Sequence, residues 1–110
     1  MSGQRVIALL GRPDAPTDAV EEYCRYLGEA LLAESFELVI ERVDWNVAGW
    51  DRAANALRRR TEAWSGAWVL AQYTALAWSA RGFPLHFPRV LKSLKAAGAR
   101  VGVVFHDIEP

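Results

Sequence analysis

Short apolar stretches separated by polar segments are the first pattern visible along the chain. The segment Val6–Leu10 is apolar without alternation, which is typical of a strand covered on both faces in a parallel sheet. Phe36, Leu38 and Ile40 instead occupy every second position, which indicates a strand with one wetter face nearer the sheet edge. The four predicted strands cover residues 6–10, 36–40, 67–71 and 101–105.

Between these strands, apolar residues recur every three or four positions and predict three helices. The first runs from about Asp18, which fits an N-cap with Glu21 three residues on, to Ala33. The second covers about 50–63, and the third begins around Pro84 and Pro88 and is closed by Gly98. The segment 44–49 is expected to be a loop. The segment 72–84 has no clean period and is typical of a long functional loop.

Strands and helices thus alternate as β-α-β-α-β-α-β, which predicts an α/β fold: a Rossmann-like three-layer domain with a four-stranded parallel sheet. In such open sheets, ligands bind beyond the carboxyl ends of the strands. The loops expected at that edge are 11–17, 44–49, 72–84 and the segment from 106 onward.

Composition and charge narrow the class of protein. The 110 residues are 52% hydrophobic, too apolar for a disordered tail. Thirteen basic residues balance thirteen acidic ones, which removes the electrostatic argument for a nucleic-acid partner, and the run Arg58–Arg60 is expected to be a solvated helix face. The single cysteine, Cys24, allows no internal disulfide, and no signal peptide or membrane span is seen, so we expect a cytoplasmic protein. Five tryptophans leave a peripheral contact with the inner face of the membrane open.

Several common sites are excluded because their spacing is missing. Only Gly11 follows the first strand, so the chain has neither the G-x-G-x-x-G of dinucleotide sites nor a P-loop. Ser65 lies between a helix and the following strand, which is the wrong place for a nucleophile elbow. The third strand ends in Gln72-Tyr73 rather than in acidic residues, which weakens a phosphoacceptor reading.

His106 is the main candidate for chemistry because it follows the last strand. A neutral imidazole there could hydrogen-bond a sugar hydroxyl or act as an acid or base, and the alternative is a histidine that caps backbone groups at the core edge. Asp107 and Glu109 could join it around a cation. We expect no metal, because side chains at successive positions of an extended chain do not converge on one point. We expect no other cofactor either.

Two further segments carry candidate binding residues. Gly11 and Arg12 could bring backbone amides and a guanidinium to a phosphate or sugar; the alternative is a tight turn with an exposed arginine. Tyr73 and Arg81 offer a stacking surface and a cation of the kind used in sugar contacts, together with Trp78 and Phe83. The alternative for these aromatic residues is packing of the loop onto the domain.

Taken together, the chain resembles the N-terminal Rossmann-like domain of GT-B fold glycosyltransferases, closest to the retaining group called glycosyltransferase family 4. Bacterial members show a similar Q-Y strand end, an R-G-x-P before a helix and an H-E or H-D after the next strand. The corresponding segments here are Val69–Tyr73, Arg81–Pro84 and Val103–Asp107. Gly11–Pro13 after the first strand also carries the resemblance, which covers essentially all 110 residues.

The resemblance implies a nucleotide-sugar-dependent hexosyltransferase that needs no metal, with residues 1–110 as its acceptor-side domain. A second domain would hold most contacts to the nucleotide-sugar donor, and the acceptor would be a sugar, a lipid-linked sugar or another hydroxyl compound. On this analogy His106 is catalytic and lies beside the transferred sugar. Gly11, Arg12, Tyr73, Arg81 and Asp107 bind substrate.

We therefore expect the 110-residue chain to be a fragment that is inactive alone. The alternative is a complete small flavodoxin-like module that binds a ligand or protein without catalysis. A third interpretation is an interaction domain that uses exposed tryptophans such as Trp45 and Trp50.

Overall fold

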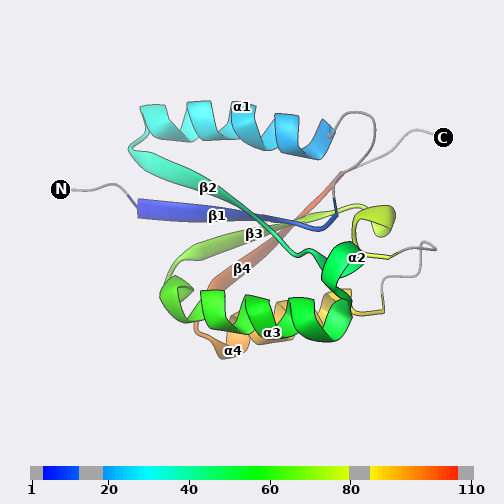
Figure 1. Ribbon diagram of the computed structural model, residues 1–110. Coiled ribbons are helices and arrows are strands. Elements are labelled where there is room, and N and C mark those ends of the chain that lie inside the picture. The colour runs from blue at the N-terminus through cyan, green and yellow to red at the C-terminus, as the bar shows by residue number, and fades with distance from the viewer. Residues whose placement is uncertain (1–3, 13–18, 80–84, 107–110) are drawn as a thin grey trace.

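Four parallel strands form one sheet in the computed structural model of the chain, which describes residues 4–12, 19–79 and 85–106 (Figure 1). The strands are β1 (Gln4–Leu10), β2 (Phe36–Arg42), β3 (Trp68–Tyr73) and β4 (Arg100–Phe105). Their spatial order is β2-β1-β3-β4, and every neighbouring pair is parallel. The predicted parallel α/β sheet is confirmed, and the alternating segment around Leu38 lies in an edge strand as expected.

Helices cover both faces of this sheet. They are α1 (Ala19–Ala33), α2 (Trp45–Ala48), α3 (Trp50–Thr61) and α4 (Phe87–Ala96), with one-turn 3₁₀ helices η1 (Glu62–Trp64) and η2 (Ala75–Ala77). Helix α1 lies on one face, over β2 and β1, while α3 and α4 lie side by side on the other (Figure 1). None of the described helices has the length and apolar character needed to cross a bilayer.

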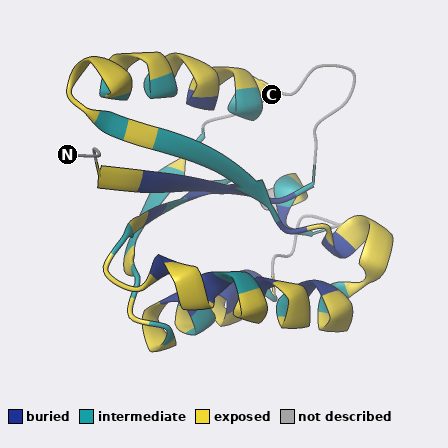
Figure 2. Cartoon of the chain, turned by 60° about the vertical axis from the view of Figure 1, so that its left-hand side comes forward, coloured by how far each residue is buried: buried dark blue, intermediate teal, exposed yellow. Residues whose placement is uncertain are grey.

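The strand period of two divides the apolar residues of β1 between two cores. Ala8 and Leu10 face α1 and pack with Cys24, whereas Ile7 and Leu9 face α3 and α4. Figure 2 shows the inner strands buried and the outer sides of the helices exposed. The larger core, on the α3 and α4 side, includes Leu57, Trp64, Val69, Trp78 and Leu94. Continuous burial of β1 explains its unbroken apolar sequence.

The structure differs from the sequence-based prediction mainly around residues 44–49, which were expected to be a loop. They contain the short helix α2, and Trp45 within it is only 8% exposed. Its indole N–H donates a hydrogen bond to the Ala77 carbonyl at 2.8 Å, 32 residues further along the chain. A hydrogen bond to a distant segment holds the short helix α2 in place, so the local pattern of apolar and polar residues did not predict it. Pro88 lies in the first turn of α4, where its missing N–H costs no helical hydrogen bond.

Candidate functional site

The carboxyl ends of all four strands meet at one edge of the sheet because the strands are parallel. The chain passes from β1 outward to β2 and then crosses back to β3 on the other side of β1. The strand order therefore reverses between β1 and β3, and ligands of open α/β sheets bind outside such a point. Gly11 follows β1 there, and Gln72 and Tyr73 end β3.

Gln72 and His106 form a close polar contact at this edge. His106 follows β4, and its backbone N–H continues the ladder by donating to the Tyr73 carbonyl at 3.0 Å. Its side-chain Nε2 lies 2.6 Å from Oε1 of Gln72. The Gln72 side chain is 1% exposed, so its amide must find partners within the protein. A polar residue buried at a strand end and directed at an imidazole marks this position as the candidate site.

The partners of Gln72 determine the tautomer of His106. The Gln72 amide nitrogen donates to the Leu70 carbonyl at 2.9 Å, and a carbonyl oxygen can only accept. Oε1 of Gln72 therefore faces His106 as an acceptor, and Nε2 of His106 must carry the proton. In the neutral ring Nδ1 is then the acceptor.

Burial keeps this imidazole neutral near pH 7, since desolvation lowers the pKa of His106 below its usual value. Tyr23 of α1 contributes to the enclosure, with its ring edge-on to the imidazole at 5.0 Å between centroids. The result is a half-buried, neutral base with a fixed ring orientation. Such a group can accept a hydrogen bond from a hydroxyl or take its proton.

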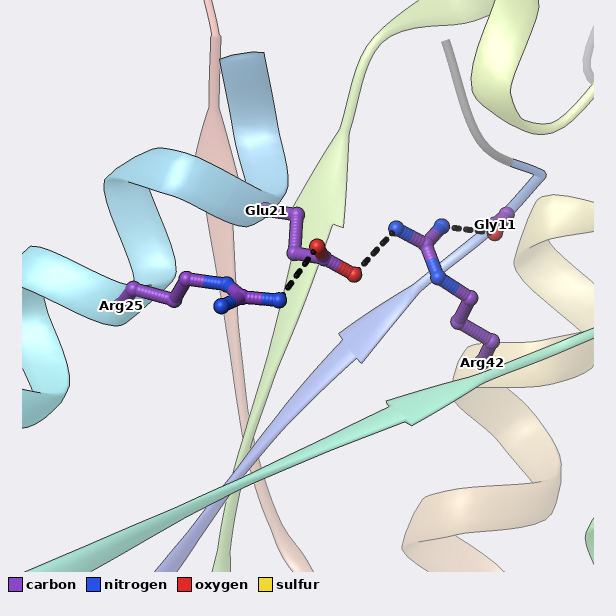
Figure 3. Close-up of polar contacts among 4 residues, drawn as sticks. All are labelled: Gly11, Glu21, Arg25 and Arg42. Carbon is purple, nitrogen blue, oxygen red and sulfur yellow. Dashed lines mark hydrogen bonds and ion pairs between the residues drawn. The ribbon is translucent and has the colours of Figure 1, made fainter. Parts of the chain in front are cut away.

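On the same side of the sheet, a chain of ionic contacts joins β2, β1 and α1 (Figure 3). Arg42 at the end of β2 donates to the Gly11 carbonyl and to the Glu21 carboxylate, both at 3.0 Å. Arg25 contacts the other Glu21 oxygen at 3.0 Å. Hydrogen bonds from Arg42, and then from Arg25, lower the pKa of Glu21, which stays ionised. These contacts hold Glu21 in the first turn of α1, two residues before Tyr23.

The contacts of Arg12 lie on a different side of the sheet from those of His106. Its backbone N–H donates to the Ala77 carbonyl at 2.9 Å, its Nε donates to the Leu76 carbonyl at 2.6 Å, and its guanidinium lies 5.3 Å from the ring centroid of Trp45. Within the described chain, the contacts of Arg12 and those of His106 share no residue. The structure thus places both at the carboxyl edge, on opposite sides of the sheet.

Gly11, Tyr73 and Trp78 are packed into the structure. A Cβ at Gly11 would lie 2.0 Å from the Ala77 carbonyl oxygen, so only glycine allows this close approach. Tyr73 packs between Phe87 and Phe105 at 5.0 and 5.4 Å. Trp78 is fully buried, and its indole donates to the Gln72 carbonyl at 2.8 Å. Packing is therefore the observed role of Trp78.

Four other candidates lie outside the described residues: Arg81, Phe83, Asp107 and Glu109. Sequence reasoning missed Gln72, Glu21, Tyr23 and Arg42 as parts of the site. A glutamine closing an apolar strand was a usable signal for Gln72, because such a residue is buried only with a partner. No group of potential metal ligands is present among the described residues.

Comparison of the chain with models of protein families, with curated proteins and with solved structures finds no significant match.

Proposed function

We propose that this chain is the acceptor-side domain of a nucleotide-sugar-dependent glycosyltransferase that transfers a hexose to a hydroxyl acceptor. The single observation that supports this most is the neutral His106 at the carboxyl edge, held by Gln72 with Nδ1 as acceptor. A hydroxyl group is the natural partner of such a nitrogen. The sequence resemblance to GT-B enzymes in Gln72-Tyr73 and His106-Asp107 supports the same reading.

In the proposed reaction, the acceptor oxygen bonds to the anomeric carbon of the donor sugar. The bond from that carbon to the nucleoside diphosphate breaks, and the diphosphate leaves with the electron pair and takes up the proton of the acceptor hydroxyl. Nδ1 of His106 accepts a hydrogen bond from a hydroxyl of the bound sugar and holds it in place. A second domain would bind most of the donor, so the acceptor, a sugar or a lipid-linked sugar, is the ligand of this chain. The proposed location is the cytoplasm, at the inner face of the membrane where the acceptor is lipid-linked.

A nuclear magnetic resonance titration of the purified chain tests the proposal. Methyl glucosides and disaccharides are added, and the side-chain resonances of both histidines are followed. Saturable shifts of His106 are expected, and they should disappear in Gln72→Leu. His86 is the internal control, since it stacks on Trp50 away from the Gln72 contact and should not move. Shifts of equal size at both histidines, or none at His106 at any sugar concentration, would refute the proposal.

A binding module without catalysis is the second candidate, because the described residues form a sheet with a packed core on each face. The two candidates differ in the coding sequence after Pro110. Continuation into a second α/β domain supports the enzyme, and a stop codon supports the module. Incubation of the 110-residue chain with UDP- or GDP-sugars and acceptors should give no transfer in either case. The third interpretation was an interaction surface of exposed tryptophans. Trp45 cannot belong to such a surface, because it is buried.

A further inference from the structure

Residues of α3 and of the start and middle of α4 line a small pocket. These two helices lie on the face of the sheet opposite α1 (Figure 1). The volume of the pocket is about 100 Å³. The polar part of its lining consists of Arg58 from α3 and of His86, Arg89 and Ser93 from the start and middle of α4. Trp50, Ala54, Leu57 and Val90 supply the apolar part. The pocket shares no lining residue with the His106 site, so it is a separate feature.

The charged side chains that line this pocket are all positive. Two guanidinium groups line it, and none of the described carboxylates does. Three other arginines of the described chain are paired with carboxylates: Arg25 and Arg42 contact Glu21, and Arg60 contacts Glu41. By contrast, the contacts of the two pocket arginines are with neutral groups. Arg58 donates to the Asn55 amide oxygen, and Arg89 lies 3.0 Å from Nδ1 of His86.

The contact with Arg89 also assigns the protons of His86. A guanidinium has only donors, so Nδ1 of His86 accepts, and the neutral ring carries its proton on Nε2. The ring is held in place by stacking on Trp50 at 4.7 Å, and Trp50 stacks on Trp45 at 5.3 Å. The pocket thus combines two cations, an imidazole N–H and the Ser93 hydroxyl, all of which can donate hydrogen bonds. Little side-chain freedom remains to be lost at His86 when a ligand binds.

We propose that this pocket binds the phosphate group of a small phosphate-bearing molecule. Arginine pairs bind phosphate oxygens with strong charge-assisted hydrogen bonds, and a dianion with three terminal oxygens uses four donors better than a carboxylate does. Complete small-molecule sites occupy roughly 300–1,000 Å³, so a pocket near 100 Å³ fits the phosphate group while the rest of the ligand extends into solvent.

The test uses the whole chain and three probes: inorganic phosphate, phenyl phosphate and acetate, each titrated at constant ionic strength. Backbone and histidine resonances are recorded for each. Phosphate is expected to shift His86, Arg89 and Ser93 saturably. Tighter binding of phenyl phosphate would identify a monoester as the ligand, and equal binding would identify free phosphate; both support the pocket. Acetate should bind much more weakly.

Variants then separate a built site from general electrostatic attraction. Arg89→Gln and Arg58→Gln should each weaken phosphate binding about tenfold, the factor for losing one charge-assisted hydrogen bond. Arg59→Gln is the matched control, because Arg59 sits in the same basic turn of α3 but does not line the pocket. The proposal is overturned if Arg59→Gln weakens binding equally, if acetate binds as tightly as phosphate, or if the wild-type shifts map elsewhere. All three arginines are exposed, so the variants should fold.

Discussion

Gly11 is the position where the smallest substitution should have the largest structural effect. A Cβ added there would lie 2.0 Å from the Ala77 carbonyl oxygen and 2.8 Å from its carbon, whereas ordinary contacts begin at 3.4 Å. The obstacle is backbone, so the segment around Ala77 must move. That carbonyl accepts hydrogen bonds from the Arg12 N–H and the Trp45 indole, and both would be strained.

The expected cost of Gly11→Ala follows from these contacts. Overpacking a close-packed site costs about 1–3 kcal/mol, and weakening two hydrogen bonds adds about 1 kcal/mol each at most. We therefore expect the free energy of unfolding to fall by about 3 kcal/mol, measured by denaturant titration as a lower midpoint at unchanged slope. Gly28→Ala is the matched control. Its Cβ would meet Leu38 at an ordinary 3.4 Å inside α1, so it should be neutral or stabilise by up to about 1 kcal/mol. Equal midpoints for wild type and Gly11→Ala would refute the packing argument.

Four other outcomes are expected. Burial lowers the folded-state pKa of His106, so the unfolded chain takes up the proton first as the pH falls below about 6.5. The free energy of unfolding, measured by denaturant titration, should therefore decrease below that pH, and His106→Asn should remove this decrease. The lowered pKa of Glu21 stabilises the fold above its unfolded value of 4.5, so Glu21→Gln should flatten the loss of stability at lower pH. Gln72→Leu should cost about 1 kcal/mol and populate the Nδ1–H tautomer of His106, read from ¹⁵N chemical shifts. Leu94→Ala, at a fully buried position, should cost about 2–5 kcal/mol in thermal or denaturant unfolding.

The sequence predicted what depends on local pattern. The unbroken apolar run of β1 and the alternation in β2 revealed the inner and edge strands, because burial on two faces or on one leaves a direct trace in residue order. The carboxyl-edge position of His106 followed from the alternation of strands and helices. Its partner did not, since Gln72 and His106 are 34 residues apart and meet only once β3 and β4 pair in register. Helix α2 was missed for the same reason, because its Trp45 is held by a distant carbonyl.

The two sides of the sheet differ in what they leave for a ligand at the point where the strand order reverses. On the α3 and α4 side, the chain itself fills the position: Ala77 lies against Gly11, and Trp78 is fully buried. On the α1 side, the Gln72 side chain and His106 meet instead. Gln72 makes hydrogen bonds on both sides of the sheet. Its backbone carbonyl accepts from the Trp78 indole, and its side-chain amide oxygen orients the His106 imidazole. Trp78→Phe removes the first of these bonds without touching His106, so a resulting change in the His106 tautomer would show that packing on one face of the sheet sets the chemistry on the other. An unchanged tautomer would instead mean that the contacts of the Gln72 side chain are sufficient.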